Sequence, residues 1–219
     1  MIGRQALYDI VRLLVTGFEP FRNYKENSSW AVAEKVAACS VEGVEVITCL
    51  LPVSFAGVAS ALRKVVAECC PDVVLMLGQA AGIDYIKLER IAINMMDSMA
   101  ADNDGYRADE EIICDDGPAA LFANCDIKGL RKAVEESGTA AKVSNSAGLY
   151  VCNRLYYEAL LLCKERPGIS ALFVHLPFYD GQPSAKEGQP TMPLDDMVKA
   201  VETIIGRPAF LTDSNKEIG

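Results

Sequence analysis

The chain has 219 residues, of which 51% are hydrophobic and 23% charged, and its formal net charge is −9 at pH 7. This length and composition predict one soluble globular domain over residues 1–219. The negative charge argues against nucleic acid or an anionic membrane surface as a partner, because both are also negative. No apolar run approaches the ~20 residues that a membrane-spanning helix needs.

Residues 1–10 lack the apolar core of a signal peptide, so we expect a cytoplasmic protein. The eight cysteines form no C-x-x-C pair, and we expect most of them to be buried, reduced thiols. With one histidine in the chain, a zinc site of the usual Cys/His kind is not expected.

Short apolar runs rich in β-branched residues alternate with longer helical patterns, which predicts an α/β fold with a largely parallel sheet. In chain order we expect strand 12–16, helix 29–38, strand 44–51, helix 55–68, strands 73–77 and 91–95, helix 127–136, strand 141–144, helix 151–164, strand 171–176 and helix 194–205. Segments 97–116 and 179–191 are predicted to be long loops, and the residues from about 211 a frayed tail.

The one histidine, His175, stands at the end of an apolar run that Pro177 must terminate. This position predicts an imidazole near the carboxyl end of a buried strand, where open α/β sheets build their active sites. A hydrogen-bonded core histidine is an equally good interpretation of the same context.

Cys152 follows a turn of small residues, 144–148, and begins the predicted helix 151–164. A thiol in the first turn of a helix faces the positive end of the dipole and unpaired N–H groups, which favour a thiolate. The order strand, turn, nucleophile and helix also resembles that of α/β hydrolases, although their G-x-S-x-G motif is absent. Taken alone, Cys152 is more often interpreted as a structural cysteine, and Cys163 on the same helix is assigned to the core.

A Cys–His pair needs a third group to hold the imidazole in one tautomer. The chain has 30 acidic residues, and composition cannot choose among them. Glu89 stands near the start of the predicted strand 91–95, and by itself it is more often interpreted as a solvated surface residue.

Seven short blocks follow one another along the chain. They are Thr16-Gly17-Phe18-Glu19-Pro20-Phe21, Gly78-Gln79-Ala80, Glu89-Arg90-Ile91-Ala92-Ile93-Asn94, Asp116-Gly117-Pro118-Ala119-Ala120, Ser144-Asn145-Ser146-Ala147-Gly148, Val151-Cys152-Asn153 and His175-Leu176-Pro177-Phe178. In this order, over roughly residues 11 to 205, they closely resemble pyroglutamyl peptidase type I, a family of cysteine peptidases that remove pyroglutamate from peptide N-termini.

The resemblance implies a three-layer α/β/α sandwich around a twisted, mostly parallel sheet, with no metal or other cofactor. It implies peptides with N-terminal pyroglutamate as partners and a homo-oligomer, either a dimer or a tetramer. Carried onto matching positions, the resemblance assigns a catalytic triad of Cys152, His175 and Glu89. The positions that it assigns to substrate binding are Phe18, Phe21, Gln79 and Val151.

Several positions depart from the family pattern. Arg22 and Asn23 replace two glycines, Ser28 replaces a proline, Ala81 replaces a glycine and Met99 replaces an arginine. Replacing glycine removes easy access to positive φ near the substrate. Beside an active pyroglutamyl peptidase, two alternatives therefore stay open: a related cysteine hydrolase or amidase with shifted substrate preference, and a non-catalytic paralogue that binds modified peptide N-termini. The intact triad argues against the latter.

Overall fold

The computed structural model describes residues 10–22, 24–38 and 40–207, so Asn23 and the expected tail lie outside the described residues. The elements in chain order are β1 (Val11–Phe18), α1 (Ser28–Val36), β2 (Val44–Leu51), α2 (Gly57–Cys69), β3 (Val73–Gln79), β4 (Ile86–Glu89), β5 (Ile91–Ile93), β6 (Ala120–Phe122), α3 (Ile127–Glu136), β7 (Ala141–Ser144), α4 (Val151–Glu165), β8 (Ser170–Leu176), β9 (Phe178–Tyr179), β10 (Thr191–Met192) and α5 (Leu194–Ile205). Four of these match the predicted bounds, namely β2, β7, α3 and α5.

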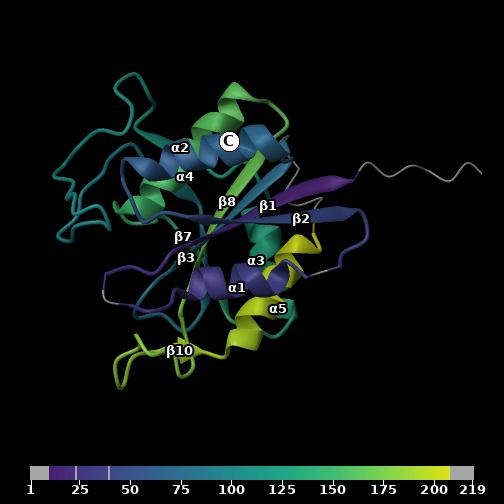
Figure 1. Ribbon diagram of the computed structural model, residues 1–219. Coiled ribbons are helices and arrows are strands. Elements are labelled where there is room, and N and C mark those ends of the chain that lie inside the picture. Colours follow the sequence, from purple (N-terminus) through teal and green to yellow (C-terminus); the bar gives the residue numbers. More distant parts are fainter. Residues whose placement is uncertain (1–9, 23, 39, 208–219) are drawn as a thin grey trace, which may run out of the picture.

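The main sheet has six strands in the order β2-β1-β3-β8-β4-β7. Neighbouring strands run parallel except β4 and β8, which are antiparallel. Figure 1 shows α2 and α4 on one face of this sheet and α1, α3 and α5 on the other. The predicted α/β/α sandwich with a mostly parallel sheet is therefore confirmed.

Alternation along the strands divides the apolar core between the two faces of the sheet. Leu13 and Val15 of β1 pack in the cluster that includes α1, α3 and α5, whereas Leu14 packs in the cluster that includes α2 and α4. Because successive side chains of a strand point to opposite faces, a strand that is covered on both sides must be apolar at consecutive positions. The continuous apolar runs of β1, β3 and β8 follow from this arrangement.

One strand of the sheet was not predicted. The predicted strand 91–95 is the shorter β5, which pairs with β6 in a separate antiparallel ribbon, and the sheet position belongs instead to β4. In β4 the apolar Ile86 and Leu88 alternate with Lys87 and Glu89, and these charged residues interrupt the apolar run that would have indicated a strand. Glu89 is fully buried at the end of β4, so its interpretation as a surface residue is wrong.

Both predicted long loops are present. Segment 97–116 is irregular apart from a bridge between Met96 and Glu111 at its base. The second loop is closed by the two-residue strands β9 and β10, which pair in parallel. Within the described ranges, no helix is both long and apolar enough to cross a membrane.

Candidate active site

Cys152 is the second residue of α4, as predicted. The residue before the helix, Tyr150, makes no side-chain hydrogen bond that caps it. The first N–H groups of a helix have no carbonyl partner within the helix. Those beside Cys152 therefore point out of the N-terminal end of α4, where the Tyr150 side chain does not cap them. This arrangement places a thiol beside hydrogen-bond donors that could receive a developing negative charge.

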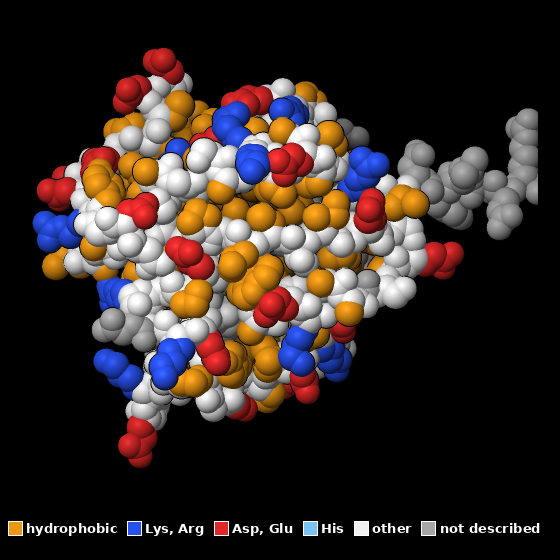
Figure 2. Space-filling model, viewed as in Figure 1, with side chains coloured by type: hydrophobic (Ala, Val, Ile, Leu, Met, Phe, Trp, Pro, Cys, Tyr) orange, Lys and Arg blue, Asp and Glu red, His pale blue; other side chains and the backbone are white. Residues whose placement is uncertain are grey.

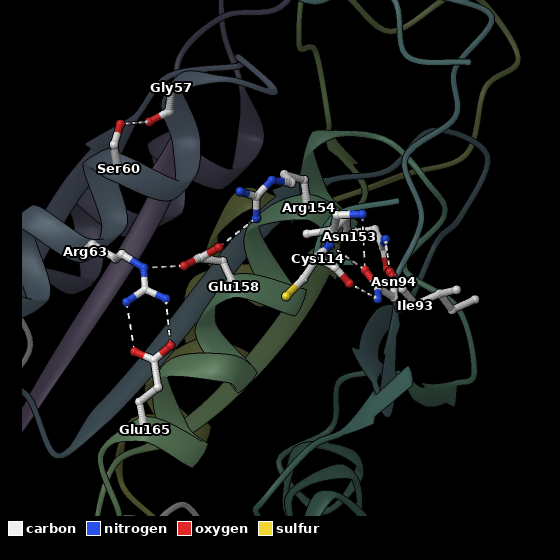
Figure 3. Close-up of polar contacts among 11 residues, drawn as sticks. Gly57, Ser60, Arg63, Ile93, Asn94, Cys114, Asn153, Arg154, Glu158 and Glu165 are labelled. Carbon is white, nitrogen blue, oxygen red and sulfur yellow. Dashed lines mark hydrogen bonds and ion pairs between the residues drawn. The ribbon is translucent and has the colours of Figure 1, made fainter. Parts of the chain in front are cut away.

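Asn153, the next residue, anchors this first turn to the end of β5 and the residues that follow it (Figure 3). Its side chain is fully buried, and its Oδ1 accepts from the Ile93 N–H at 2.9 Å. Its Nδ2 donates to the carbonyls of Ile93 at 2.8 Å and Met95 at 2.9 Å. Three bonds to one backbone segment fix the start of α4, and with it the height of Cys152 above the sheet.

An ion-pair network holds the same helix against α2 (Figure 3). The buried Glu158 accepts from Arg154 at 2.8 Å and also pairs with Arg63 of α2, whose guanidinium forms two further bonds to Glu165 at 2.9 and 3.0 Å. A carboxylate buried to this degree needs such partners to offset its desolvation. The network limits sliding of α4 along α2.

His175 lies on β8, next to the end of that strand, and only 5% of it is exposed. Its Nδ1 lies 2.8 Å from Oε1 of Glu89, which comes from the neighbouring strand β4. A carboxylate can only accept, so Nδ1 carries the proton and Nε2 is left as the acceptor that a general base requires. The structure thus brings together His175 and Glu89, which are 86 residues apart in the chain.

The Glu89 carboxylate has an asymmetric environment. Oε1 also lies 3.1 Å from Nζ of Lys87, whereas Oε2 is buried and has no hydrogen-bond partner among the described residues. Lys87 is one residue that sequence reasoning missed. The alternation of Ile86, Lys87, Leu88 and Glu89 could have revealed it, because residues two apart on a strand share a face.

The Cys152 thiol differs from the expectation of a stabilised thiolate. Burial and, to a smaller extent, the Glu89 carboxylate raise the pKa of Cys152 to about 12, although a backbone hydrogen bond and Lys87 act in the opposite direction. Removal from water and a nearby anion therefore outweigh the positive end of the helix. The thiol is neutral at rest, and its proton must pass to a base when it attacks.

A cavity of about 100 Å³ opens beside Cys152 and is lined by Phe18, Phe21, Asn27, Val53, Gln79, Tyr150 and Val151. All four positions assigned to substrate binding by resemblance thus lie together around the thiol. Asn27, Val53 and Tyr150 were missed, since they belong to no block that carried the resemblance. The rings of Phe21 and Tyr150 lie 5.2 Å apart, so the wall is largely aromatic.

Gly17 explains how Phe18 reaches this cavity. A Cβ at position 17 would lie 2.8 Å from the Ser29 carbonyl oxygen and from the Trp30 Cα, which is too close for any side chain. Glycine therefore lets β1 approach α1, and the Phe18 N–H donates to Oγ of Ser29 at 3.0 Å. This contact fixes the ring of Phe18 at the end of the strand.

Backbone donors determine the orientation of the Gln79 side chain. The Ser28 N–H donates to Oε1 of Gln79 at 2.9 Å, and Nε2 of the buried Gln182 donates to the same oxygen at 2.7 Å. Gln182 is itself oriented by the Tyr179 N–H, which donates to its Oε1 at 3.1 Å. Because a backbone N–H can only donate, both amides have one possible orientation, and Nε2 of Gln79 is the donor left for the cavity.

Four departures from the family pattern, at Arg22, Ser28, Ala81 and Met99, lie within the described residues and outside the cavity wall. Arg22 has φ of 57°, and its guanidinium lies 4.7 Å from the centroid of the Phe21 ring. Met99 is 96% exposed, and Ala81 is also exposed. None of the four lines the cavity, but Arg22 stacks on Phe21, which does.

The described residues contain no group of three or more His, Cys, Asp or Glu side chains placed to hold a metal ion. A thiol at a helix start, an imidazole on a strand end and a carboxylate on Nδ1 form the side-chain set that nucleophilic acyl transfer requires. The fold and the site together define the class of α/β cysteine hydrolases.

Comparison with known proteins narrows this class. The family model described as pyroglutamyl peptidase matches residues 11–208. The pyrrolidone-carboxylate peptidase of Thermococcus onnurineus is 41% identical over 196 residues, which cover 89% of this chain and 97% of the relative. The pyrrolidone-carboxylate peptidase of Clavibacter michiganensis is 38% identical over 193 residues, which cover 88% of this chain and 90% of the relative.

Solved structures agree with the sequence comparison. The pyrrolidone carboxyl peptidase from Thermococcus litoralis superposes with a TM-score of 0.88 at 30% identity, covering 95% of this chain and 98% of its own. The pyrrolidone carboxyl peptidase from Fervidobacterium islandicum superposes with a TM-score of 0.86 at 36% identity, covering 91% of this chain and 98% of its own. The chain belongs to the pyroglutamyl peptidase family of cysteine peptidases.

Proposed function

We propose that this enzyme hydrolyses the bond after an N-terminal pyroglutamyl residue of a peptide. The observation that carries the proposal is a free donor, Nε2 of Gln79, in an aromatic cavity beside the Cys152 thiol. The pyroglutamyl lactam is a small ring with a carbonyl acceptor and no charge. A carbonyl that was buried without a partner would cost about 1–3 kcal/mol, so the Gln79 donor favours the lactam.

In the proposed reaction, His175 accepts the Cys152 proton at Nε2 while the sulfur attacks the carbonyl carbon of the peptide bond that follows the pyroglutamyl ring. The resulting oxyanion lies near the first N–H groups of α4. His175 then protonates the leaving amine as the C–N bond breaks, which leaves a thioester. Water, deprotonated by His175, attacks the thioester, and pyroglutamate leaves as the thiol regains its proton.

Glu89 has an orienting role in this scheme. Its bond to Nδ1 holds the tautomer in which Nε2 can accept, and its charge offsets that of the transient imidazolium. The raised pKa of Cys152 makes this assistance necessary, because little thiolate exists near neutral pH without a base.

The cavity also supports an expected rejection of ordinary N-termini. Asn27 directs its side chain to the Glu19 carbonyl and to Ser29, so it does not offer a free acceptor to an ammonium group. Burying an unpaired ammonium costs far more than burying an amide. We therefore expect pyroglutamyl amides to be cleaved, and prolyl and glutaminyl amides to remain intact.

A fluorogenic pyroglutamyl amide, assayed beside the prolyl and glutaminyl amides, tests the proposal. Selective cleavage of the pyroglutamyl amide supports it. Equal turnover of the prolyl amide would indicate the alternative hydrolase or amidase of shifted preference, which the stacked Arg22 motivates. Binding without turnover would indicate the non-catalytic paralogue.

We further infer that the chain acts in the cytoplasm as one peptidase domain that associates into a dimer or a tetramer. Figure 2 shows hydrophobic side chains on the surface between the two helical layers, in the region of the edge strand β2. Leu50 of this strand is 45% exposed, and Val46, Ile47 and Cys49 are only half-buried. An apolar sheet edge of this kind supports association between copies. Light scattering on the purified chain would measure the subunit number.

A further inference from the structure

Lys87 lies between the two halves of the proposed catalytic machinery. Its Nζ is 3.1 Å from Oε1 of Glu89 and 3.3 Å from the carbonyl oxygen of Ser146, in the turn that leads to α4. In the antiparallel register of β4 and β8, Lys87 is directly opposite His175. The ammonium thus contacts the acid of the triad and the turn before the nucleophile, and it is a cross-strand neighbour of the base.

The buried Glu89 carboxylate needs a positive partner to offset its desolvation. Glu89 is fully buried on β4, and His175 on β8 brings it a positive charge only when the imidazole is protonated. Tyr156 of α4 donates to the Glu89 carbonyl, and burial raises its pKa well above the ordinary value, so it stays neutral. The strand on the other side of β8, β3, carries no charged residue. Among the described residues, Lys87 is the lysine or arginine in contact with the Glu89 carboxylate.

We propose that Lys87 is a positioning residue for the reaction: its ammonium neutralises Glu89, so that Cys152 can lose its proton and His175 stays available as a base. Coulomb's law gives the direction. Removing a positive charge favours the protonated form of each neighbouring acid, and the uncompensated Glu89 carboxylate has the same effect. In a protein without the Lys87 charge, both contributions would make the Cys–His pair active only at higher pH.

The neighbouring strand provides a matched control. Lys142 of β7 is in register with Lys87, but its Nζ lies 4.1 Å from the centroid of the Tyr85 ring instead of contacting the Glu89 carboxylate. Lys142→Met removes one charge from the same sheet and spares the contact with Glu89. Lys87→Gln keeps a hydrogen-bond donor without charge, and Lys87→Arg keeps the charge.

Two measurements test the proposal. The first is the rate of alkylation of Cys152 by iodoacetamide, followed by mass spectrometry of its peptide, and the second is the pH profile of kcat/KM. For Lys87→Met and Lys87→Gln we expect alkylation at about pH 8 to slow roughly tenfold and the acidic limb to move up by about one pH unit. Lys87→Arg and Lys142→Met should follow the wild type.

A Lys87→Gln profile that superimposes on the wild type would overturn the proposal, as would an equal shift in Lys142→Met. If Lys87→Met does not fold, the comparison of Lys87→Gln with Lys87→Arg still shows whether the charge at position 87 is needed. The inference extends the proposed function, but alkylation requires no substrate. A wild type that cleaves no pyroglutamyl amide would therefore refute the substrate assignment and leave the alkylation test of Lys87 intact.

Discussion

Two polar pairs contribute to this site, one beside the thiol and one beside the cavity. Glu89 and His175 lie on adjacent strands of the main sheet, and the register of β4 and β8 sets their separation. Gln79 and Gln182 are instead joined between a strand end and a loop, and backbone N–H groups orient both amides. Sheet register cannot shift without turning every side chain to the other face, whereas a loop can adjust locally.

This difference teaches where the site can change. The groups proposed for the reaction depend on the core, so their geometry is difficult to alter. The groups proposed for recognition depend on α1, on the loop after β9 and on segment 19–22, and the departures Arg22 and Ser28 both lie there. We expect substitutions of the first kind to act on kcat and those of the second kind on KM.

The strongest test of the reacting groups is Cys152→Ser. We expect turnover of the pyroglutamyl amide to fall by about 10⁴-fold or more, because an alkoxide is far harder to generate than a thiolate. Cys163→Ser on the same helix is the matched control and should retain activity, since Cys163 does not line the cavity. EDTA should have no effect. Inactivation by EDTA would contradict a thiol mechanism.

Glu89→Gln should reduce kcat by about 10²- to 10³-fold with little change in KM, because the amide keeps a bond to Nδ1 but cannot offset the imidazolium charge. Steady-state kinetics on the pyroglutamyl amide measures both constants. Glu165→Gln, which removes an ion pair with Arg63 far along α4, controls for loss of charge. Unchanged kinetics in Glu89→Gln would remove this residue from the triad.

Gln182→Met should raise KM for the pyroglutamyl amide by about tenfold with a smaller change in kcat. The substitution keeps the side-chain length but removes the shorter of the two bonds to Oε1 of Gln79, 2.7 Å against 2.9 Å, so that its amide is held less firmly. Gln189→Met in the same loop removes only a bond from the Lys186 N–H and should leave KM unchanged. A lower kcat at constant KM would show that the loop supports the chemistry instead.

Arg22→Gly should lower KM about two- to threefold and raise the free energy of unfolding by up to ~1 kcal/mol. Glycine adopts the left-handed conformation of this position without strain and exposes the Phe21 ring. Glu110→Gly, at φ of 51°, is the matched control: it should gain stability similarly in urea unfolding but leave KM as it was. Equal KM values in all three proteins would exclude Arg22 from control of the entrance.

The smallest effect is expected for Ser28→Pro, which restores the residue of the family pattern. Proline suits the first position of a helix but has no N–H, so Gln79 loses the Ser28 bond and keeps that of Gln182. KM should rise by less than about threefold, because one donor still orients the amide. A rise as large as that of Gln182→Met would mean that both donors are needed.

Much of the scaffold was predictable from the amino-acid sequence. Apolar runs at consecutive positions identify strands that are covered on both faces, and amphipathic segments with clear ends identify helices, so the bounds of β2, β7, α3 and α5 were predicted correctly. The position of Cys152 at a helix start follows from the same local pattern. These features depend on neighbours in the chain, which a sequence displays.

The partners of the site depend on tertiary structure. Glu89 contacts His175 across 86 residues and Gln182 contacts Gln79 across 103, and nothing local distinguishes these side chains from other acids and amides. The strand β4 was not predicted because the charged residues Lys87 and Glu89 interrupt its apolar pattern. The raised pKa of Cys152 also depends on assembly, because burial and the nearness of Glu89 arise only when the strands and α4 pack together.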